Sequence, residues 1–168
     1  MRTLPGLLLA LALILANAFF VAAEFALVAV DRTRLGFEAE EGSRAARAAE
    51  KLLSRLSFNL SGAQLGITIT SLALGLLAQP VVAELIEPAV AGVVGDASAL
   101  AVSVVVALLA TTVVQMVVGE LVPKSVAVAK PLETTLRLAP AYRIYALVFR
   151  PVIAVCNTSA NKLLQLVG

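Results

Sequence analysis

Residues 97–119 read ASALAVSVVVALLATTVVQMVVG and contain no charged side chain. Two other segments share this character: residues 56–83 carry no charge, and residues 3–30 carry only Glu24. A helix needs about 20 apolar residues to cross the roughly 30 Å of hydrocarbon in a bilayer. Because lipid cannot satisfy backbone hydrogen-bonding groups, apolar runs of this length must be helical. The sequence therefore predicts three membrane spans, at about 3–30, 57–83 and 97–122.

The overall composition also indicates a chain that is solvated mainly by lipid. Hydrophobic residues make up 60% of the 168 residues and charged residues only 14%, whereas a soluble domain carries about a quarter charged residues. The mean hydropathy is +0.97. A formal net charge of only +2 argues against nucleic acid as a partner. With one cysteine and no histidine, a bound metal must be a hard cation held by oxygen.

The positions of the basic residues predict the orientation in the membrane. The charged residues of the segment between the second and third spans are all acidic. The other two connections are basic: Arg32, Arg34, Arg44, Arg47, Lys51 and Arg55 follow the first span, and Lys124, Lys130, Arg137, Arg143, Arg150 and Lys162 follow the third. Since cytoplasmic loops are enriched in Lys and Arg, we expect a multi-pass protein of the cell's inner (plasma) membrane. Its N-terminus would lie outside and its C-terminus in the cytoplasm.

Amphipathic helices are expected on the cytoplasmic side of the spans. Residues 34–55 are rich in helix-forming residues and contain no proline. The tail over 132–167 is apolar but interrupted by charges, and Pro151 should divide it into two helices that lie along the membrane surface. A fourth, arginine-bearing span in this tail and a cleaved N-terminal signal peptide remain as alternatives. The predicted fold class is therefore an all-α membrane protein with three transmembrane helices and amphipathic juxtamembrane helices.

Polar residues line one face of the second span. They recur at i, i+4, i+7 and i+11, the spacing of a shared helical face: Gln64, Thr68, Ser71 and Gly75. Thr70 adds a hydroxyl nearby, and Asn17 and Glu24 share a face of the first span. Interhelical hydrogen bonding would explain any single hydroxyl. A complete polar stripe favours a functional role.

The third span ends in Gly119-Glu120-Leu121-Val122-Pro123. A carboxylate inside a span costs roughly 2.5–3.5 kcal/mol on insertion scales, so Glu120 is a functional candidate. Pro123 has no amide proton to donate to the carbonyl four residues earlier, which is that of Gly119. Loose carbonyls at broken helices coordinate ions in several transporters. The alternative is a carboxylate near the cytoplasmic interface that pairs with Lys124 or Lys130.

Together these oxygens predict a metal site. A cage of six oxygens suits Mg²⁺, which prefers ligands at about 2.0–2.1 Å, although Na⁺ would accept the same groups. The predicted ligands are Glu120, Gly119, Asn17, Thr68 and Ser71, with Gln64, Thr70 and Glu24 as secondary candidates.

Three ordered motifs carry a resemblance to a known family. They are NAFFVAAEFALVAVDRTRL at residues 17–35, QLGITITSLALG at 64–75 and GELVPKSVAV at 119–128. In this order they resemble the transmembrane domain of the CorC/cyclin M family of Mg²⁺ transporters, also called the DUF21 domain. The resemblance covers nearly the whole chain. It places Glu120 at the family's acidic residue before Leu/Ile-x-Pro and Asn17 at the polar position before the two phenylalanines.

The resemblance implies Mg²⁺ transport, with efflux coupled to Na⁺, by a homodimer of three-span protomers with a belt of juxtamembrane helices. It also implies CBS domains, which this chain does not contain, so nucleotide would act only through those missing regulatory domains. One position departs from the pattern: Val21 stands where many relatives have serine. Gly62 and Gly66 would let another helix approach closely, in a second copy or within one protomer.

Two functions therefore follow from the sequence. The first is a Mg²⁺ transporter membrane domain that binds a largely dehydrated ion between its three spans. The alternative is a Mg²⁺-sensing membrane scaffold that transports nothing. An enzyme is not expected, because no histidine can act as a base and Asp31 and Asp96 are predicted at opposite membrane edges.

Overall fold

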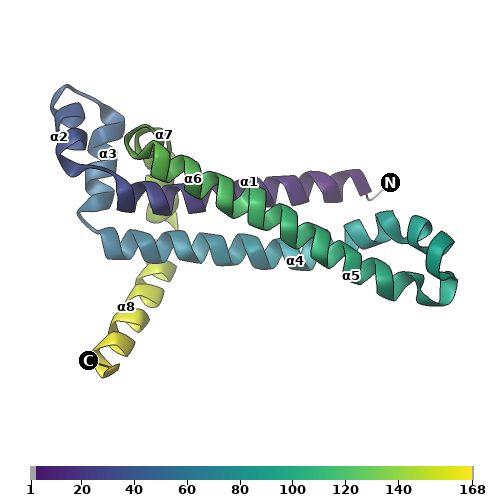
Figure 1. The fold of residues 1–168 in the computed structure, drawn as a ribbon. Helices are drawn as coiled ribbons and strands as arrows, with labels where there is room; N and C mark the ends of the chain where they lie inside the picture. The colour runs from purple at the N-terminus through teal and green to yellow at the C-terminus, as the bar shows by residue number, and fades with distance from the viewer. Residues whose placement is uncertain (1–2, 168) are drawn as a thin grey trace. The chain divides into compact units, whose positions relative to one another are not determined.

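The computed structural model describes residues 3–167, which are helical almost throughout and contain no strand. Three stretches of helix are long and apolar enough to span a membrane, at 4–29, 56–94 and 97–129. The last two helices meet these criteria only as one broken span bent by 85°. The predicted all-α fold with three spans is confirmed. The elements are α1 (Thr3–Ala29), α2 (Arg32–Glu40), α3 (Arg44–Leu53), α4 (Leu56–Val94), α5 (Asp96–Val114), the π-helical η1 (Gln115–Leu121), α6 (Val122–Ala129), α7 (Pro131–Val148) and α8 (Arg150–Val167) (Figure 1).

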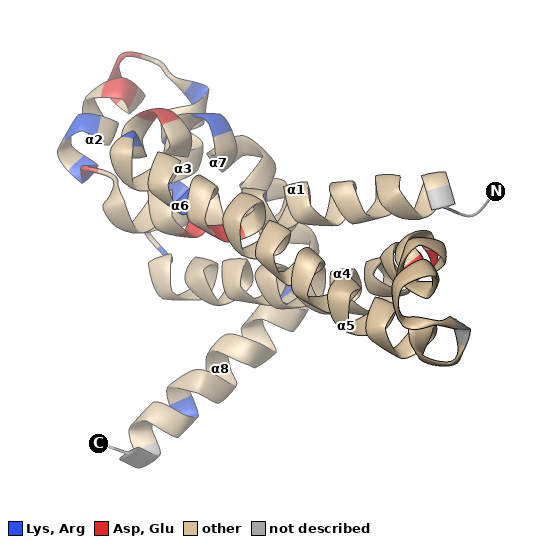
Figure 2. Cartoon of the chain, turned by 45° about the vertical axis from the view of Figure 1, so that its right-hand side comes forward, with Lys and Arg blue, Asp and Glu red and all other residues tan. Residues whose placement is uncertain are grey.

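The chain forms two compact units, and α1 and α4 contribute to both. The first unit combines the N-terminal residues through Ala18 with Thr68–Val122. The second combines Phe19–Ile67 with the C-terminal residues from Pro123 onward. The basic residues of the described chain, drawn in blue in Figure 2, all belong to the second unit. The charged residues in the described part of the first unit are all acidic.

Helix boundaries differ from expectation at three places, one of which is the third span, whose helical stretch continues to Ala129 and not only to about residue 122. Residues 34–55 form two helices, because Gly42 adopts a φ of 102° that ends α2 and Ser43 then caps α3 by accepting a hydrogen bond from the Ala46 amide at 3.2 Å. Helix α4 continues to Val94, well beyond residue 83, with Pro80 and Pro88 in its interior. Figure 1 shows α4 changing direction in its C-terminal part, which is the usual effect of proline inside a helix.

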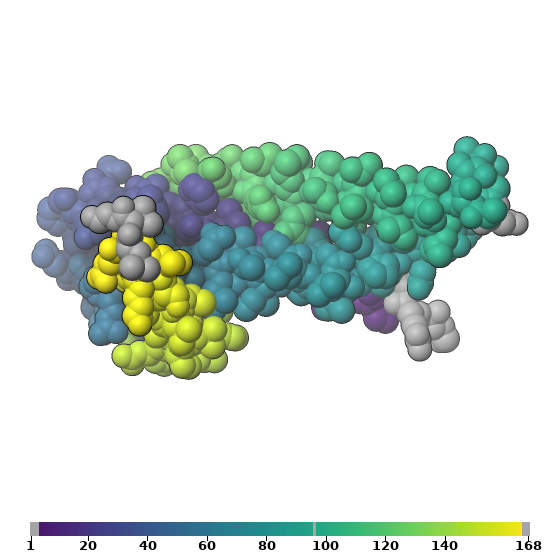
Figure 3. Space-filling model, turned by 90° about the horizontal axis from the view of Figure 1, so that it is seen from below, coloured from purple at the N-terminus to yellow at the C-terminus, as the bar shows by residue number. Residues whose placement is uncertain are grey.

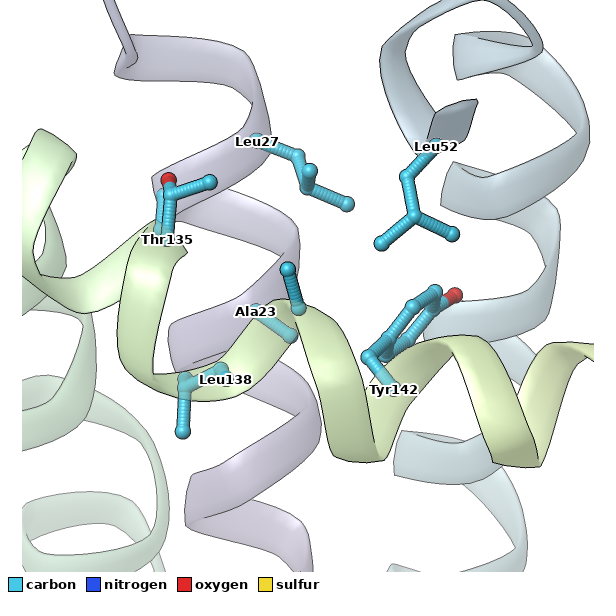
Figure 4. Close-up of a pocket in the computed structure, with 8 residues that line it drawn as sticks. Ala23, Leu27, Leu52, Thr135, Leu138 and Tyr142 are labelled. Atoms are coloured by element: carbon cyan, nitrogen blue, oxygen red, sulfur yellow. The ribbon is translucent and has the colours of Figure 1, made fainter. Parts of the chain in front are cut away.

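The second unit has the larger apolar core, in which α7 is attached to the beginning of α4. The Tyr142 hydroxyl donates to the Asn59 carbonyl, and the Tyr145 hydroxyl donates to the Gly62 carbonyl at 2.9 Å. Figure 4 shows Leu27, Leu52 and Tyr142 pointing toward one small cavity of about 10 Å³, lined mainly by apolar side chains. A space of this size holds one water molecule at most, so the core is closely packed.

Helix α8 is held to the start of α4 by a small polar contact. The Asn157 side-chain oxygen accepts hydrogen bonds from Ser61 at 3.1 Å and from Ser57 at 3.2 Å. The space-filling view shows α8, in yellow, beside the blue beginning of α4 (Figure 3). The contact is partly exposed, so it fixes α8 less firmly than the buried Tyr142 fixes α7.

Gly66 is the position in the second unit where the close approach of a neighbour demands glycine. A Cβ atom there would lie 2.6 Å from two ring atoms of Phe20. That ring packs against Phe19 and Tyr145, with centroids 5.2 Å and 4.7 Å away. The ring therefore has little room to retreat.

We expect Gly66→Ala to lower the free energy of unfolding by about 1–3 kcal/mol, as overpacking of a filled site does. Gly92→Ala is the matched control, because a Cβ there meets nothing within 4 Å. Alanine in that helical position should be neutral or stabilise by up to about 1 kcal/mol. Thermal unfolding of the purified variants in detergent measures both changes. Equal stability of the two variants would contradict the packing described here.

Candidate cation site

Asn17, on α1 in the first unit, is completely buried and makes three hydrogen bonds. Its amide nitrogen donates to the Gly119 carbonyl at 3.1 Å. Its oxygen accepts from the Thr70 hydroxyl at 2.8 Å and from the Ser71 hydroxyl at 3.2 Å. One side chain thus connects the polar face of α4 with the end of the third span.

Gln115, the first residue of η1, extends this network. Its amide nitrogen donates to the Ser71 hydroxyl at 2.8 Å, while its side-chain oxygen is buried and has no hydrogen-bond partner among the described residues. A buried acceptor without a donor costs roughly 1–3 kcal/mol. The network therefore ends in the Gln115 side-chain oxygen, which can still accept a hydrogen bond or bind a cation.

The π-helical segment η1 places Gly119 and Glu120 at this network. The Val122 amide donates to the Val117 carbonyl, an i to i−5 bond, and Pro123 has no amide to donate to Gly119. The Gly119 carbonyl accepts instead from Asn17. A Cβ at position 119 would lie only 3.3 Å from that Asn17 nitrogen. Glycine therefore allows the side chain to approach the backbone.

Beside the network lies an open cleft of about 250 Å³ within the first unit. The Glu120 carboxylate is exposed and borders this cleft. Since the described part of the first unit has no Lys or Arg, no cation of that unit neutralises Glu120. The residues that line the cleft are Ser71, Leu74, Gly75, Gln79, Thr111, Thr112, Gln115 and Glu120.

The structure brings most of the predicted ligands together. Asn17, Gly119, Thr70 and Ser71 are joined by hydrogen bonds, and Glu120 shares a cleft with Ser71. Both lone pairs of the Asn17 oxygen face hydroxyl donors, so in this structure Asn17 positions other oxygen groups. Their role as metal ligands stays a prediction.

The remaining candidates do not line this cleft. Thr68 is an exposed residue of α4 and does not line the cleft. Gln64 and Glu24 belong to the second unit, where Gln64 is exposed and Glu24 is half-buried. Sequence reasoning missed Gln115, Thr111 and Thr112. One signal pointed to Gln115: it lies four residues before Gly119, on the same helical face of an otherwise apolar run.

The two lysines offered as partners for Glu120 make other contacts in the second unit. The Lys124 ammonium lies 4.5 Å from the centroid of the Phe25 ring, a cation–π contact. The Lys130 ammonium lies 3.9 Å from the Glu133 carboxylate.

The chemistry of the cleft suits a hard cation. Among the side chains that the structure describes, no group of three or more Cys, Asp or Glu residues could hold a metal ion. The cleft instead offers one carboxylate with amide and hydroxyl oxygens. Such oxygens are ligands of Mg²⁺, Ca²⁺ or Na⁺, and Mg²⁺ usually keeps several of its waters.

The fold and this cleft define a helical membrane domain with a polar, acidic site. The family described as the cyclin M transmembrane N-terminal domain matches residues 8–168, and the chain belongs to this family.

Similar proteins occur in several bacteria. A Mycobacterium tuberculosis protein, MT1889, is 42% identical over 168 residues, which is all of this chain and 48% of the relative. The UPF0053 protein YhdT of Bacillus subtilis is 39% identical over 169 residues, which is all of this chain and 37% of the relative. The chain thus spans about half the length, or less, of these curated relatives.

We expect Asn17→Leu to lower the free energy of unfolding by about 1–3 kcal/mol, because it removes the three hydrogen bonds of a buried side chain, including the one that the Gly119 carbonyl accepts. Asn157→Leu is the matched control, since the Asn157 oxygen also accepts from two hydroxyl groups, those of Ser57 and Ser61, but in a partly exposed place. Its cost should stay below about 1 kcal/mol. Thermal unfolding in detergent without divalent cations measures the stability of both variants. A control as destabilised as Asn17→Leu would contradict the assigned role of the buried network.

Proposed function

We propose that this chain is the membrane domain of a Mg²⁺ transporter and that its cleft at Glu120 binds the ion as substrate. The observation that carries the proposal is the buried, unpartnered oxygen of Gln115 in a cleft that also holds a carboxylate. A cation at this place would satisfy that oxygen and neutralise Glu120 at the same time. Membership of the cyclin M family supports transport over catalysis.

The charge of the site constrains how the ion is held. One carboxylate compensates half of the charge of Mg²⁺, and the other groups of the cleft are neutral. Burying an uncompensated charge is costly. The bound ion therefore keeps water molecules, which the open cleft of about 250 Å³ has room to hold.

The π-helical segment offers a way to move the ligands. A π-helical turn contains one residue more than an α-helical turn, so its conversion to α-helix would rotate the residues on one side by about 100°. Gly119 and Glu120 lie within the segment. Such a rotation would turn their oxygens away from Ser71 and release the ion. We propose this rotation as part of alternating access.

The remaining features of the proposal come from the family resemblance and the charge pattern. The transporter would export Mg²⁺ in exchange for Na⁺ as a homodimer in the inner membrane. The basic second unit would lie on the cytoplasmic side, since cytoplasmic segments are enriched in Lys and Arg.

We expect Glu120→Gln to reduce Mg²⁺ flux in proteoliposomes at least about tenfold, because it removes the one carboxylate of the cleft. Glu84→Gln is the matched control: it makes the same change on α4 at an exposed carboxylate that does not line the cleft. The control should retain wild-type flux. Undiminished transport by Glu120→Gln would refute the assigned site.

We expect Gln115→Leu to weaken Mg²⁺ binding about tenfold, so that stabilisation by Mg²⁺ falls from about 2.7 to about 1.4 kcal/mol at 100 times the wild-type Kd. Gln165→Leu makes the same exchange at an exposed position of α8 and should change nothing. Mg²⁺-dependent thermal shifts measure both. An unaltered shift in Gln115→Leu would contradict the ligand role. Binding without flux in the wild type would favour the Mg²⁺-sensing scaffold instead.

A further inference from the structure

A second cleft lies in the second unit, between the packed helices α3 and α7. It is an open groove of about 310 Å³, lined by Arg44 from the first turn of α3 and by Arg143 from α7. A space of this size matches the smaller ligand pockets of proteins, which begin near 300 Å³. We call it the two-arginine groove.

The two arginines have no protein partner. Among the described residues, neither guanidinium makes an ion pair or a hydrogen bond, and no acidic residue lines the groove. Arg137, on the same helix α7, behaves differently and pairs with Glu133 at 2.6 Å. Two exposed arginines that line one groove without a carboxylate can together bind an anion. Guanidinium binds phosphate through paired hydrogen bonds.

The start of α3 adds to this positive character. Arg44 and Ala45 are its first two residues, and both line the groove. The Ser43 side chain caps the helix by accepting from the Ala46 amide, which leaves the amides of Arg44 and Ala45 outside the helical hydrogen-bonding pattern. Such amides and the helix dipole favour a phosphate group.

The rest of the groove is apolar. Ile144 and Leu147 of α7 line it together with Pro140, and these two large side chains are 66% and 69% exposed. A soluble anion such as free phosphate would leave this wall uncovered. An amphipathic anion covers both parts, because its phosphate meets the arginines while its chain lies along Ile144 and Leu147.

We propose that the two-arginine groove binds the phosphate of an anionic phospholipid, with an acyl chain against the apolar wall. The chain is a membrane protein, so such lipids surround it, and a basic juxtamembrane pocket is suited to their headgroups. The proposal is independent of Mg²⁺ binding, because the groove and the candidate cation site belong to different units.

The test uses the full chain in nanodiscs of phosphatidylcholine with a minor fraction of phosphatidylglycerol. Lipids retained after detergent extraction are counted by native mass spectrometry. Each arginine should raise the retention of phosphatidylglycerol over phosphatidylcholine about fivefold, so Arg44→Gln/Arg143→Gln should bring the ratio near parity. Arg34→Gln/Arg150→Gln removes the same charge outside the groove and should keep the wild-type ratio.

Two further arms separate a lipid from a soluble anion. Ile144→Gln/Leu147→Gln should lower phospholipid retention, and inorganic phosphate at millimolar concentration should not raise the melting temperature of the wild type. Stabilisation by inorganic phosphate as large as that by phosphatidylglycerol would replace the lipid with a soluble anion and overturn the proposal.

Equal retention of the two lipids by the wild type would also overturn it, as would a wild-type ratio in the double arginine variant. If that variant does not fold, Arg44→Gln and Arg143→Gln are tested singly. Each should lower the ratio about fivefold. A wild-type ratio in both single variants refutes the site.

Discussion

In hydrocarbon, a backbone carbonyl without a donor has no water to replace the missing hydrogen bond, and Gly119 is where this chain meets that constraint. Pro123 removes the amide that would serve Gly119 in an α-helix. The side chain of Asn17 takes its place. Because the Asn17 oxygen then needs donors, Thr70 and Ser71 point toward it. The arrangement of the polar network therefore follows from one proline in the third span.

The same network explains why its last member is available for binding. Each hydrogen bond runs in one direction: the Gln115 nitrogen donates to Ser71, and Ser71 donates to Asn17. This leaves the Gln115 oxygen as an acceptor without a donor. An apolar side chain at position 115 would avoid the cost of a buried acceptor without a donor. The unpartnered Gln115 oxygen, in the same cleft as Glu120, is therefore better explained by binding of a ligand than by stabilisation of the fold.

The spans and most residues of the network could be predicted from the sequence. The way in which the network residues are arranged in space could not. Long uncharged segments can only be helices in lipid, and within them the polar residues Asn17, Thr70 and Ser71 are easily recognised, as is Gly119 before Glu120. The π-helical turn was not predicted, because no residue type marks it and it depends on contacts made after folding. For the same reason the sequence did not identify Gln115 as a residue of the cleft. It also placed Thr68 at the site, because Thr68 belongs to the polar face of the second span, but Thr68 does not line the cleft. The division of residues 34–55 into two helices was missed because the composition of the whole segment strongly favours helix. Only two residues, Gly42 and Ser43, mark the break.

Charge is divided between the units in a way that suits both binding proposals. In the described part of the chain, all charged side chains of the first unit are acidic. A cation in its cleft therefore meets no repulsion from a lysine or arginine of that unit. The second unit holds the basic residues of the described chain, and none of its carboxylates lines the groove. An anionic headgroup there would bind to arginines that no carboxylate already neutralises. Each unit is thus left with charge that its own residues do not compensate, and a ligand of opposite sign can supply the compensation.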